Sequence, residues 1–199
     1  MAQDKPPATR EAVARAAVKC FKQFGVHRTS MIDVAKAANL SRQTVYRLFE
    51  ARAALLEYIA TQRIQAMGEV LKPYFAEVDD LEEALVEGSM RSMAVGAKDR
   101  LYQEIVAQSG EHQVEVFTFK GSAEIQQLMV DLWSPVLNKA RERGQLVFDM
   151  TNEEIVEWIR NQHAMLFIRD DYDEAKQRQI LSCFLVPSLL RRPRDNSRT

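Results

Sequence analysis

The stretch 29–49, TSMIDVAKAANLSRQTVYRLF, restricts the fold of this chain more than any other part of it. Apolar residues recur at helical spacing in each half, which predicts two short helices over residues 31–38 and 42–49, joined by a tight turn. Asn39 lies where the first helix must stop, and asparagine tolerates a positive φ better than most residues. Ser41 is placed to cap the second helix through its hydroxyl.

The second of these helices carries an unusual number of polar side chains. Val45 and Phe49 are four residues apart and are expected to face the first helix, which leaves five residues facing away: Arg42, Gln43, Thr44, Tyr46 and Arg47. So many hydrogen-bonding groups on so short a helix indicate a helix that lies in a groove of DNA. The alternative interpretation is a solvated helix whose polar face only keeps the domain soluble.

The charge of the chain is unevenly divided. Residues 1–60 contain ten Lys and Arg against five Asp and Glu, a net charge of +5, whereas the remaining residues contain seventeen against twenty-three, a net charge of −6. Binding to phosphates requires positive charge, so this asymmetry points to nucleic-acid contact at the N-terminal end only. No apolar run reaches the length of a membrane span. Cys20 and Cys183 are expected as buried thiols of a reduced, cytoplasmic protein rather than as a disulfide.

The rest of the sequence predicts an all-α fold of about nine helices, because glycine is scarce and β-branched alternation is nearly absent. A first helix over residues 10–24 ends at Gly25, and a long helix over residues 51–72 precedes Pro73, which marks its end or a kink. Residues 109–121 alternate like a strand without a partner and are expected as a loop or a helix extension. Further helices are predicted over residues 79–95, 99–108, 122–143, 152–169 and 172–190.

Residue types at many fixed spacings match one family pattern. They are Phe24-Gly25, Thr29-Ser30-Met31, Asp33-Val34-Ala35, Ala38, Leu40-Ser41, Thr44-Val45-Tyr46, Phe49 and Leu55-Leu56. In this pattern residues 10–56 resemble the tetracycline-repressor (TetR) family of bacterial transcription regulators. The chain departs from the family at Asn39, Gln43, Leu48 and Arg52, where Gly, a small residue, His and Lys are usual. Asn39 and Arg52 keep the physical role, whereas Gln43 and Leu48 bear on which base sequence is recognised.

The candidate DNA contacts follow from residue chemistry and from this resemblance. Arginine commonly pairs with guanine and glutamine with adenine, which makes three residues candidates for base contacts: Arg42, Gln43 and Arg47. Thr44 and Ser30 are candidates for donation to phosphates. The resemblance assigns a phosphate contact to Tyr46 and another to Arg52, which lies at the start of the long helix.

The resemblance also implies how the chain is organised. A helix-turn-helix domain over residues 10–53 would follow a flexible leader, residues 1–9, and a ligand-sensing and dimerisation domain over residues 54–190 would precede a disordered tail, residues 191–199. Aromatic and methionine residues could line a ligand pocket, although each taken singly is more typical of a core: Met93, Tyr102, Phe117, Phe119, Met129, Trp133, His163 and Phe167. Arg91, Gln126 and His163 could orient a small apolar or amphipathic effector.

Dimerisation is expected because one helix-turn-helix reads too few base pairs to be specific. Two copies about 34–36 Å apart would engage successive major grooves. The last two helices suit an isologous four-helix bundle, and the interface candidates are Trp158, Met165, Ile180 and Phe184. The alternative is that these residues belong to the internal core.

Together these patterns predict a homodimeric, ligand-responsive transcriptional regulator, most simply a repressor released from a palindromic double-stranded DNA operator by a small-molecule effector. A regulator controlled by a protein partner, or by no ligand, is the alternative. Catalysis is not expected, because the three histidines lie near no nucleophile motif and no glycine-rich phosphate loop is present. The sequence predicts no cofactor and no metal-ligand spacing.

Overall fold

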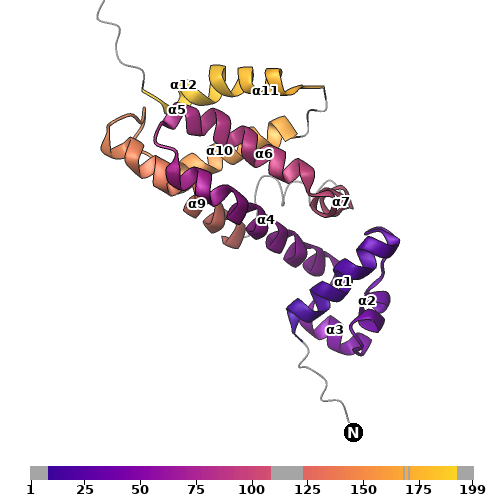
Figure 1. Ribbon diagram of the computed structural model, residues 1–199. Coiled ribbons are helices and arrows are strands. Elements are labelled where there is room, and N and C mark those ends of the chain that lie inside the picture. The colour runs from indigo at the N-terminus through magenta and orange to yellow at the C-terminus, as the bar shows by residue number, and fades with distance from the viewer. Residues whose placement is uncertain (1–8, 109–122, 168, 170, 192–199) are drawn as a thin grey trace, which may run out of the picture. The chain divides into compact units, whose positions relative to one another are not determined.

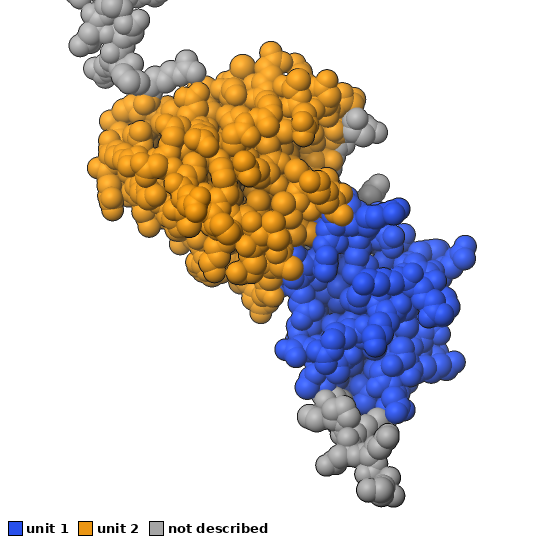
Figure 2. Space-filling view, viewed as in Figure 1, with its two compact units in different colours: residues 1–63, 99–114 blue, residues 64–98, 115–199 orange. Residues whose placement is uncertain are grey.

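The computed structural model describes residues 9–108, 123–167, 169 and 171–191. Within these ranges the chain forms nine continuous helical runs, and the one piece of extended pairing is an isolated antiparallel bridge between Leu146 and Leu190 (Figure 1). The all-α class predicted from the sequence is confirmed. Two compact units are present: unit 1 comprises residues 1–63 and 99–114, and unit 2 comprises residues 64–98 and 115–199 (Figure 2).

Unit 1 contains the three N-terminal helices. Its elements are α1 (Arg10–Phe24), α2 (Met31–Ala37), α3 (Arg42–Leu48), the first part of α4 (Arg52–Glu77), and α7 (Arg100–Gln108). Thr9 caps α1, and Gly25 ends it with a φ of 83°, as the sequence predicted. Apolar residues from all of these helices are buried, among them Val13, Phe21, Val34, Val45, Phe49, Leu55, Ile59 and Ile105.

Helix α7 is the element of unit 1 that was not expected there. Ile105 and Val106 are buried, and Asp99 caps the helix by accepting from the Tyr102 amide at 3.0 Å. The same carboxylate accepts from Arg63 Nε of α4 at 2.6 Å, and His27 Nδ1 lies 3.2 Å from Gln108 Oε1. Unit 1 therefore extends beyond residues 10–53, because a helix distant in sequence completes its packing.

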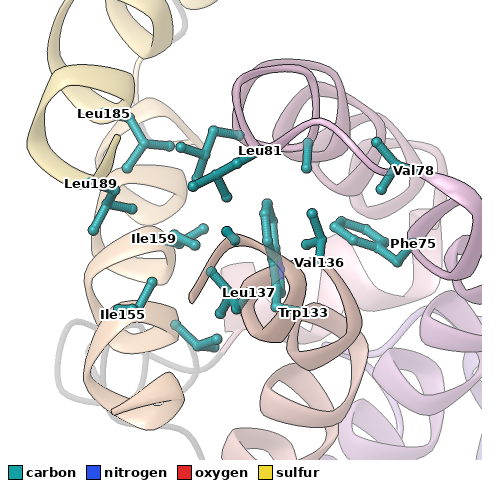
Figure 3. Packing of buried hydrophobic residues seen from close by; sticks show 14 of the residues in the cluster. Phe75, Val78, Leu81, Trp133, Val136, Leu137, Ile155, Ile159, Leu185 and Leu189 are labelled. Atoms are coloured by element: carbon teal, nitrogen blue, oxygen red, sulfur yellow. The ribbon is translucent and has the colours of Figure 1, made fainter. Parts of the chain in front are cut away.

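Unit 2 holds the larger core, part of which Figure 3 shows. Its elements are the second part of α4, α5 (Leu81–Glu83), the π-helical turn η1 (Ala84–Gly88), α6 (Ser89–Lys98), α9 (Ala123–Glu142), α10 (Asn152–Phe167), α11 (Glu174–Ile180), the π-helical turn η3 (Leu181–Leu185) and α12 (Val186–Leu189). Trp133 is fully buried near Phe75 and Val136. Thr151 and Glu154 form the capping interactions predicted for α10.

Two predicted helix boundaries around α4 are wrong. Pro73 lies inside α4, which continues to Glu77, because burial of Leu71, Phe75 and Val78 stabilises the turns on both sides of the proline. The helix predicted over residues 79–95 begins at Leu81, where Asp80 accepts from the Glu83 amide at 2.7 Å, and the helical run continues to Lys98. Pro135 likewise lies inside α9.

The C-terminal helices differ from the prediction in a similar way. Helix α10 ends at Phe167 rather than at residue 169, and α11 begins at Glu174, where Asp173 accepts from the Lys176 amide at 2.8 Å. In η3 the buried side chains are Leu181 and Leu185, whereas Cys183 and Phe184 between them are exposed. Only Cys20 is therefore a buried thiol as expected.

The predicted loop or extension over residues 109–121 lies outside the described residues. In the part of the chain that the structure covers, none of the helices combines the length and hydrophobicity needed to span a lipid bilayer.

Candidate nucleic-acid interface

The turn between α2 and α3 has the geometry that the sequence predicted. Asn39 adopts a φ of 54°, the one positive value at a non-glycine residue in the described part of the chain. The Asn39 amide donates to Lys36 O at 3.0 Å, and the Leu40 amide donates to Ala35 O at 2.9 Å. These paired bonds form a Schellman motif, which ends α2 and redirects the chain into α3. Ser41 then accepts from the Thr44 amide at 3.0 Å and caps α3.

The start of α2 is fixed by a reciprocal capping box. Ser30 Oγ accepts from the Asp33 amide at 3.3 Å, and the Ser30 amide donates to Asp33 Oδ2 at 2.9 Å. Ser30 Oγ also donates to Asp33 Oδ2 at 2.6 Å. These bonds from the Ser30 side chain and backbone lower the pKa of Asp33. The structure thus places Ser30, a candidate for donation to phosphate, in an N-cap whose hydroxyl hydrogen is directed to Asp33.

Helix α3 has one buried side and one polar side. Val45 is buried in unit 1, and Phe49, the residue after the helix, is buried as well. Thr44 is half-buried, whereas the other polar residues of the helix are exposed: Arg42, Gln43, Tyr46 and Arg47. The Arg42 guanidinium carbon lies 5.2 Å from the centroid of the Tyr46 ring, one helical turn away. A candidate base contact and a candidate phosphate contact therefore share one surface.

Arg52 holds the α1–α2 turn against the start of α4. One terminal nitrogen of its guanidinium donates to Val26 O at 2.6 Å, and Nε lies 3.4 Å from Thr29 O. Thr29 is itself buried and donates through Oγ1 to Gly25 O at 2.9 Å. Two donors of the planar guanidinium are thus directed to carbonyl oxygens, and the structure gives Arg52 a positioning role that the resemblance did not include.

Sequence reasoning missed a second arginine, Arg10. Its guanidinium carbon lies 4.7 Å from the centroid of the Phe49 ring and 4.9 Å from that of Tyr58, and the two rings meet edge to face at 5.5 Å. The contact joins the first turn of α1 to the end of α3 and to α4. No local pattern predicts it, because the three residues are far apart in sequence.

Arg52→Ala is expected to lower the free energy of unfolding by about 1–3 kcal/mol, because it leaves part-buried carbonyl oxygens without a charged donor. DNA affinity should fall for specific and non-specific duplexes alike. Urea unfolding and fluorescence anisotropy measure the two effects. Arg28→Ala is the matched control, since Arg28 is exposed on the same turn. Unchanged stability with weakened DNA binding would leave Arg52 with a phosphate contact and no positioning role.

The predicted pocket residues fall in different places. Trp133 is buried in unit 2, and Met93 and Met129 are partly buried against the same core. His163 and Phe167 are half-buried on α10. Tyr102 belongs to α7 in unit 1, while Phe117 and Phe119 lie outside the described residues.

The predicted interface residues lie on α10, α11 and η3 of unit 2. Trp158 on α10 donates from Nε1 to Ser188 Oγ of α12 at 2.9 Å, which places these helices side by side. Trp158 is 41% exposed, Met165 is 42% exposed and Phe184 is 67% exposed, whereas Ile180 is partly buried against the core. Their sequence neighbours Ile159, Leu166 and Leu185 are buried. Each helix therefore presents one apolar face inward and leaves other apolar residues exposed.

The capped α2–turn–α3 arrangement, with the polar side of α3 exposed, defines a helix-turn-helix DNA-binding regulator. Residues 13–59 match the model of a family described as bacterial regulatory proteins, tetR family. This match overlaps residues 10–56, the stretch in which the sequence resembles the same family.

Known proteins are similar over most of the chain. An uncharacterized HTH-type transcriptional regulator of Mycobacterium bovis is 28% identical over 136 residues, 67% of each chain. Thermus thermophilus FadR, a TetR-family transcriptional repressor solved in complex with lauroyl-CoA, has a TM-score of 0.69 at 20% identity, covering 92% of this chain and 96% of FadR. RolR, solved with the ligand resorcinol, has a TM-score of 0.66 at 16% identity, covering 90% of this chain and 86% of RolR. These structures share the fold.

Proposed function

We propose that this protein is a homodimeric repressor that binds a palindromic operator and is released from it by a small, mostly apolar effector. The observation that carries the DNA-binding part is the capped α3 helix, whose exposed face holds Arg42, Gln43, Tyr46 and Arg47 above a buried Val45. In this proposal Arg42, Gln43 and Arg47 contact base edges. Tyr46 and Thr44 contact phosphates.

The dimer rests on exposed apolar side chains of unit 2. Trp158, Met165 and Phe184 lie on helices whose remaining apolar residues fill the core. In an isologous interface these three side chains are buried on both copies, which removes their apolar surface from water. Two α3 helices held about 34–36 Å apart then enter successive major grooves, which is why the operator is expected to be palindromic.

The effector part rests on the interior of unit 2 and on the related structures. FadR was solved with lauroyl-CoA and RolR with resorcinol. In this chain Trp133 and His163 form a ring contact, with centroids 6.3 Å apart, beside the partly buried Met129. Because α4 runs from unit 1 into unit 2, an effector that moves the second part of α4 would change the spacing of the two reading heads, the α2–turn–α3 segments of the two copies. The difference in effector affinity between the two states sets the size of the response.

A selection from random duplexes tests this function. The purified full-length chain should recover sequences with two inverted half-sites whose centres lie one helical turn apart, about 10–10.5 base pairs, or a multiple of it. Enrichment of a single half-site, or of no sequence, would contradict the proposed dimeric repressor.

Arg42→Ala is expected to relax the preference at one base pair of each half-site and to weaken operator binding by about 1–3 kcal/mol per half-site. Tyr46→Phe should instead weaken binding to specific and non-specific duplexes by similar factors, because a phosphate contact carries no base preference. Competition titrations with single-base variants of the selected operator separate the two effects. An Arg42→Ala protein with unchanged base preference would exclude Arg42 from direct base contact.

A further inference from the structure

The interior of unit 2 contains polar atoms that form no hydrogen bond within the described part of the protein. Four of them are Tyr74 OH on α4, Ser89 Oγ on α6, Trp133 Nε1 on α9 and His163 Nε2 on α10, and each atom is buried. Buried polar groups in folded proteins nearly always have partners, because removal from water without one is costly. Four such atoms on four different helices therefore need an explanation.

These atoms belong to one cluster. The rings of Tyr74 and Phe75 lie 5.4 Å apart, those of Phe75 and Trp133 lie 4.6 Å apart, and those of Trp133 and His163 lie 6.3 Å apart. A row of rings thus connects α4, α9 and α10, and Figure 3 shows Phe75 and Trp133 together in the core.

Ser89 joins this row through the residue before it. A Cβ atom on Gly88 would lie 2.8 Å from Phe75 Cζ and 3.4 Å from Tyr74 Cε1, so the backbone at that point lies directly against the two rings. The absence of a side chain at Gly88 is what permits this approach. Three of the four unpartnered atoms belong to this row of rings, and Ser89 follows directly on a backbone position that lies against it.

Every member of the cluster can donate a hydrogen bond, and the two hydroxyls can also accept one. The Trp133 indole can only donate. Burial raises the pKa of Tyr74, with Glu83 adding to the effect and Arg91 opposing it, so the phenol keeps its hydrogen. Burial, with a smaller contribution from Arg160, lowers the pKa of His163 to about 4, so the imidazole is neutral near pH 7, with one ring nitrogen that donates and one that accepts.

The charges around the cluster also favour a ligand with acceptor atoms. Arg160 is 8% exposed and close enough to His163 to affect its titration. The Arg91 guanidinium carbon lies 4.5 Å from the centroid of the Tyr74 ring. Glu83 is the carboxylate that influences Tyr74, and its side chain is exposed. Two guanidinium groups thus lie near the cluster and the one carboxylate near it is exposed, which disfavours a cationic ligand.

We propose that the effector of this regulator is a mostly apolar molecule that presents carboxylate or carbonyl oxygens to Trp133, His163 and Tyr74. This inference rests on the proposed function, and it adds the chemical class of the ligand. The apolar body packs along the row of rings, and the partly buried Met93 and Met129 adjust around it, because methionine side chains are flexible. The acceptor oxygens supply hydrogen bonds that these three groups lack.

Two substitutions remove an unpartnered hydroxyl with little change of shape: Tyr74→Phe and Ser89→Ala. Without ligand, both variants should unfold at the same temperature as the native chain or a higher one, because no hydrogen bond is lost. Ser92→Ala is the matched control on the same helix, since Ser92 Oγ already has a partner and donates to Gly88 O at 2.7 Å. A clear fall in melting temperature for both cluster variants would show that their hydroxyls have partners in the folded protein, and would overturn the proposal.

Calorimetric titration of the full-length chain then tests the ligand class. The probes are benzoate and decanoate, with benzylammonium and decylammonium as cations of matching size. At least one carboxylate should bind saturably and about tenfold or more tighter than its matching cation. Tyr74→Phe should weaken carboxylate binding about fivefold, the effect of one lost hydrogen bond, and Ser92→Ala should not change it.

The outcomes separate this inference from the proposed function. Cations that bind as tightly as carboxylates, or the absence of binding by both carboxylates, would overturn the effector class. If the duplex selection still returns palindromic sites in that case, the DNA-binding function stands without it. If the selection returns no such sites while carboxylates bind as expected, the proposed repressor function fails and the assigned binding chemistry remains.

Discussion

Phe184→Glu should convert the protein to a monomer at micromolar concentration and reduce operator affinity by about 100-fold or more, because two linked reading heads gain their affinity from being held together. Phe184 is 67% exposed on η3, so a charged side chain there should leave the core of unit 2 intact. In a symmetric interface the substitution would bring two carboxylates close to the axis and leave them without water. Sedimentation velocity and anisotropy with the selected operator measure the two effects.

Phe148→Glu is the matched control. Phe148 is 60% exposed, close to the value of Phe184, but it lies in the connection between α9 and α10 rather than on the proposed interface. This variant should remain a dimer and bind the operator as the native chain does. A Phe184→Glu protein that still sediments as a dimer would rule out the bundle formed by α10 to α12.

Acidification should destabilise unit 2 well before the carboxylates titrate, because of His163. Its pKa falls from an ordinary value of 6.5 to about 4 in the folded protein, mainly by burial and secondarily through Arg160. The unfolded chain therefore takes up a proton at a pH at which the folded chain does not. The stability linked to this group is complete above pH 6.5 and is lost as the pH falls towards 4, in total about 3 kcal/mol.

His163→Leu tests this pH dependence directly. The variant should show a nearly flat free energy of unfolding between pH 6.5 and pH 4, where the native chain declines, as measured by urea unfolding at closely spaced pH values. Asp33, Asp79 and Asp171 have lowered pKa values from bonds to Ser30, Arg143 and Arg169. Their contributions disappear only as the pH falls below their ordinary value of 3.8, so both proteins should share that second decline. An equal slope in both proteins above pH 4 would exclude His163 as the source.

The structure of the reading head could be predicted from the sequence because the interactions that form it are between residues close together in the chain. The Ser30–Asp33 capping box, the positive φ of Asn39 and the Ser41 cap each depend on residues within five positions of one another. The exposed polar face of α3 follows from helical periodicity once Val45 is assigned to the core. The family match over residues 13–59 covers the same stretch.

The packing of unit 2 was harder to predict from the sequence because its helices have apolar residues on more than one side. Periodicity showed that α10 carries both Trp158 and Ile159, but packing against the neighbouring helices decides that Ile159 is buried and Trp158 is not. Pro73 is tolerated in α4 for the same reason, because burial of Phe75 compensates for a local penalty. The burial of His163 Nε2 likewise depends on residues far along the chain.

The sequence by itself determined that this chain is all-α, where its reading helix begins and ends, and which face of that helix is polar. Only the tertiary structure decided that α7 completes unit 1, that Arg52 and Arg10 hold the reading head in position, and that four polar atoms in the interior of unit 2 are buried without a hydrogen-bond partner. The physical reason is the separation of the interacting residues along the sequence. Caps, turns and periodicity depend on residues a few positions apart, whereas segments distant in sequence decide which side chains are buried and which polar groups find hydrogen-bond partners.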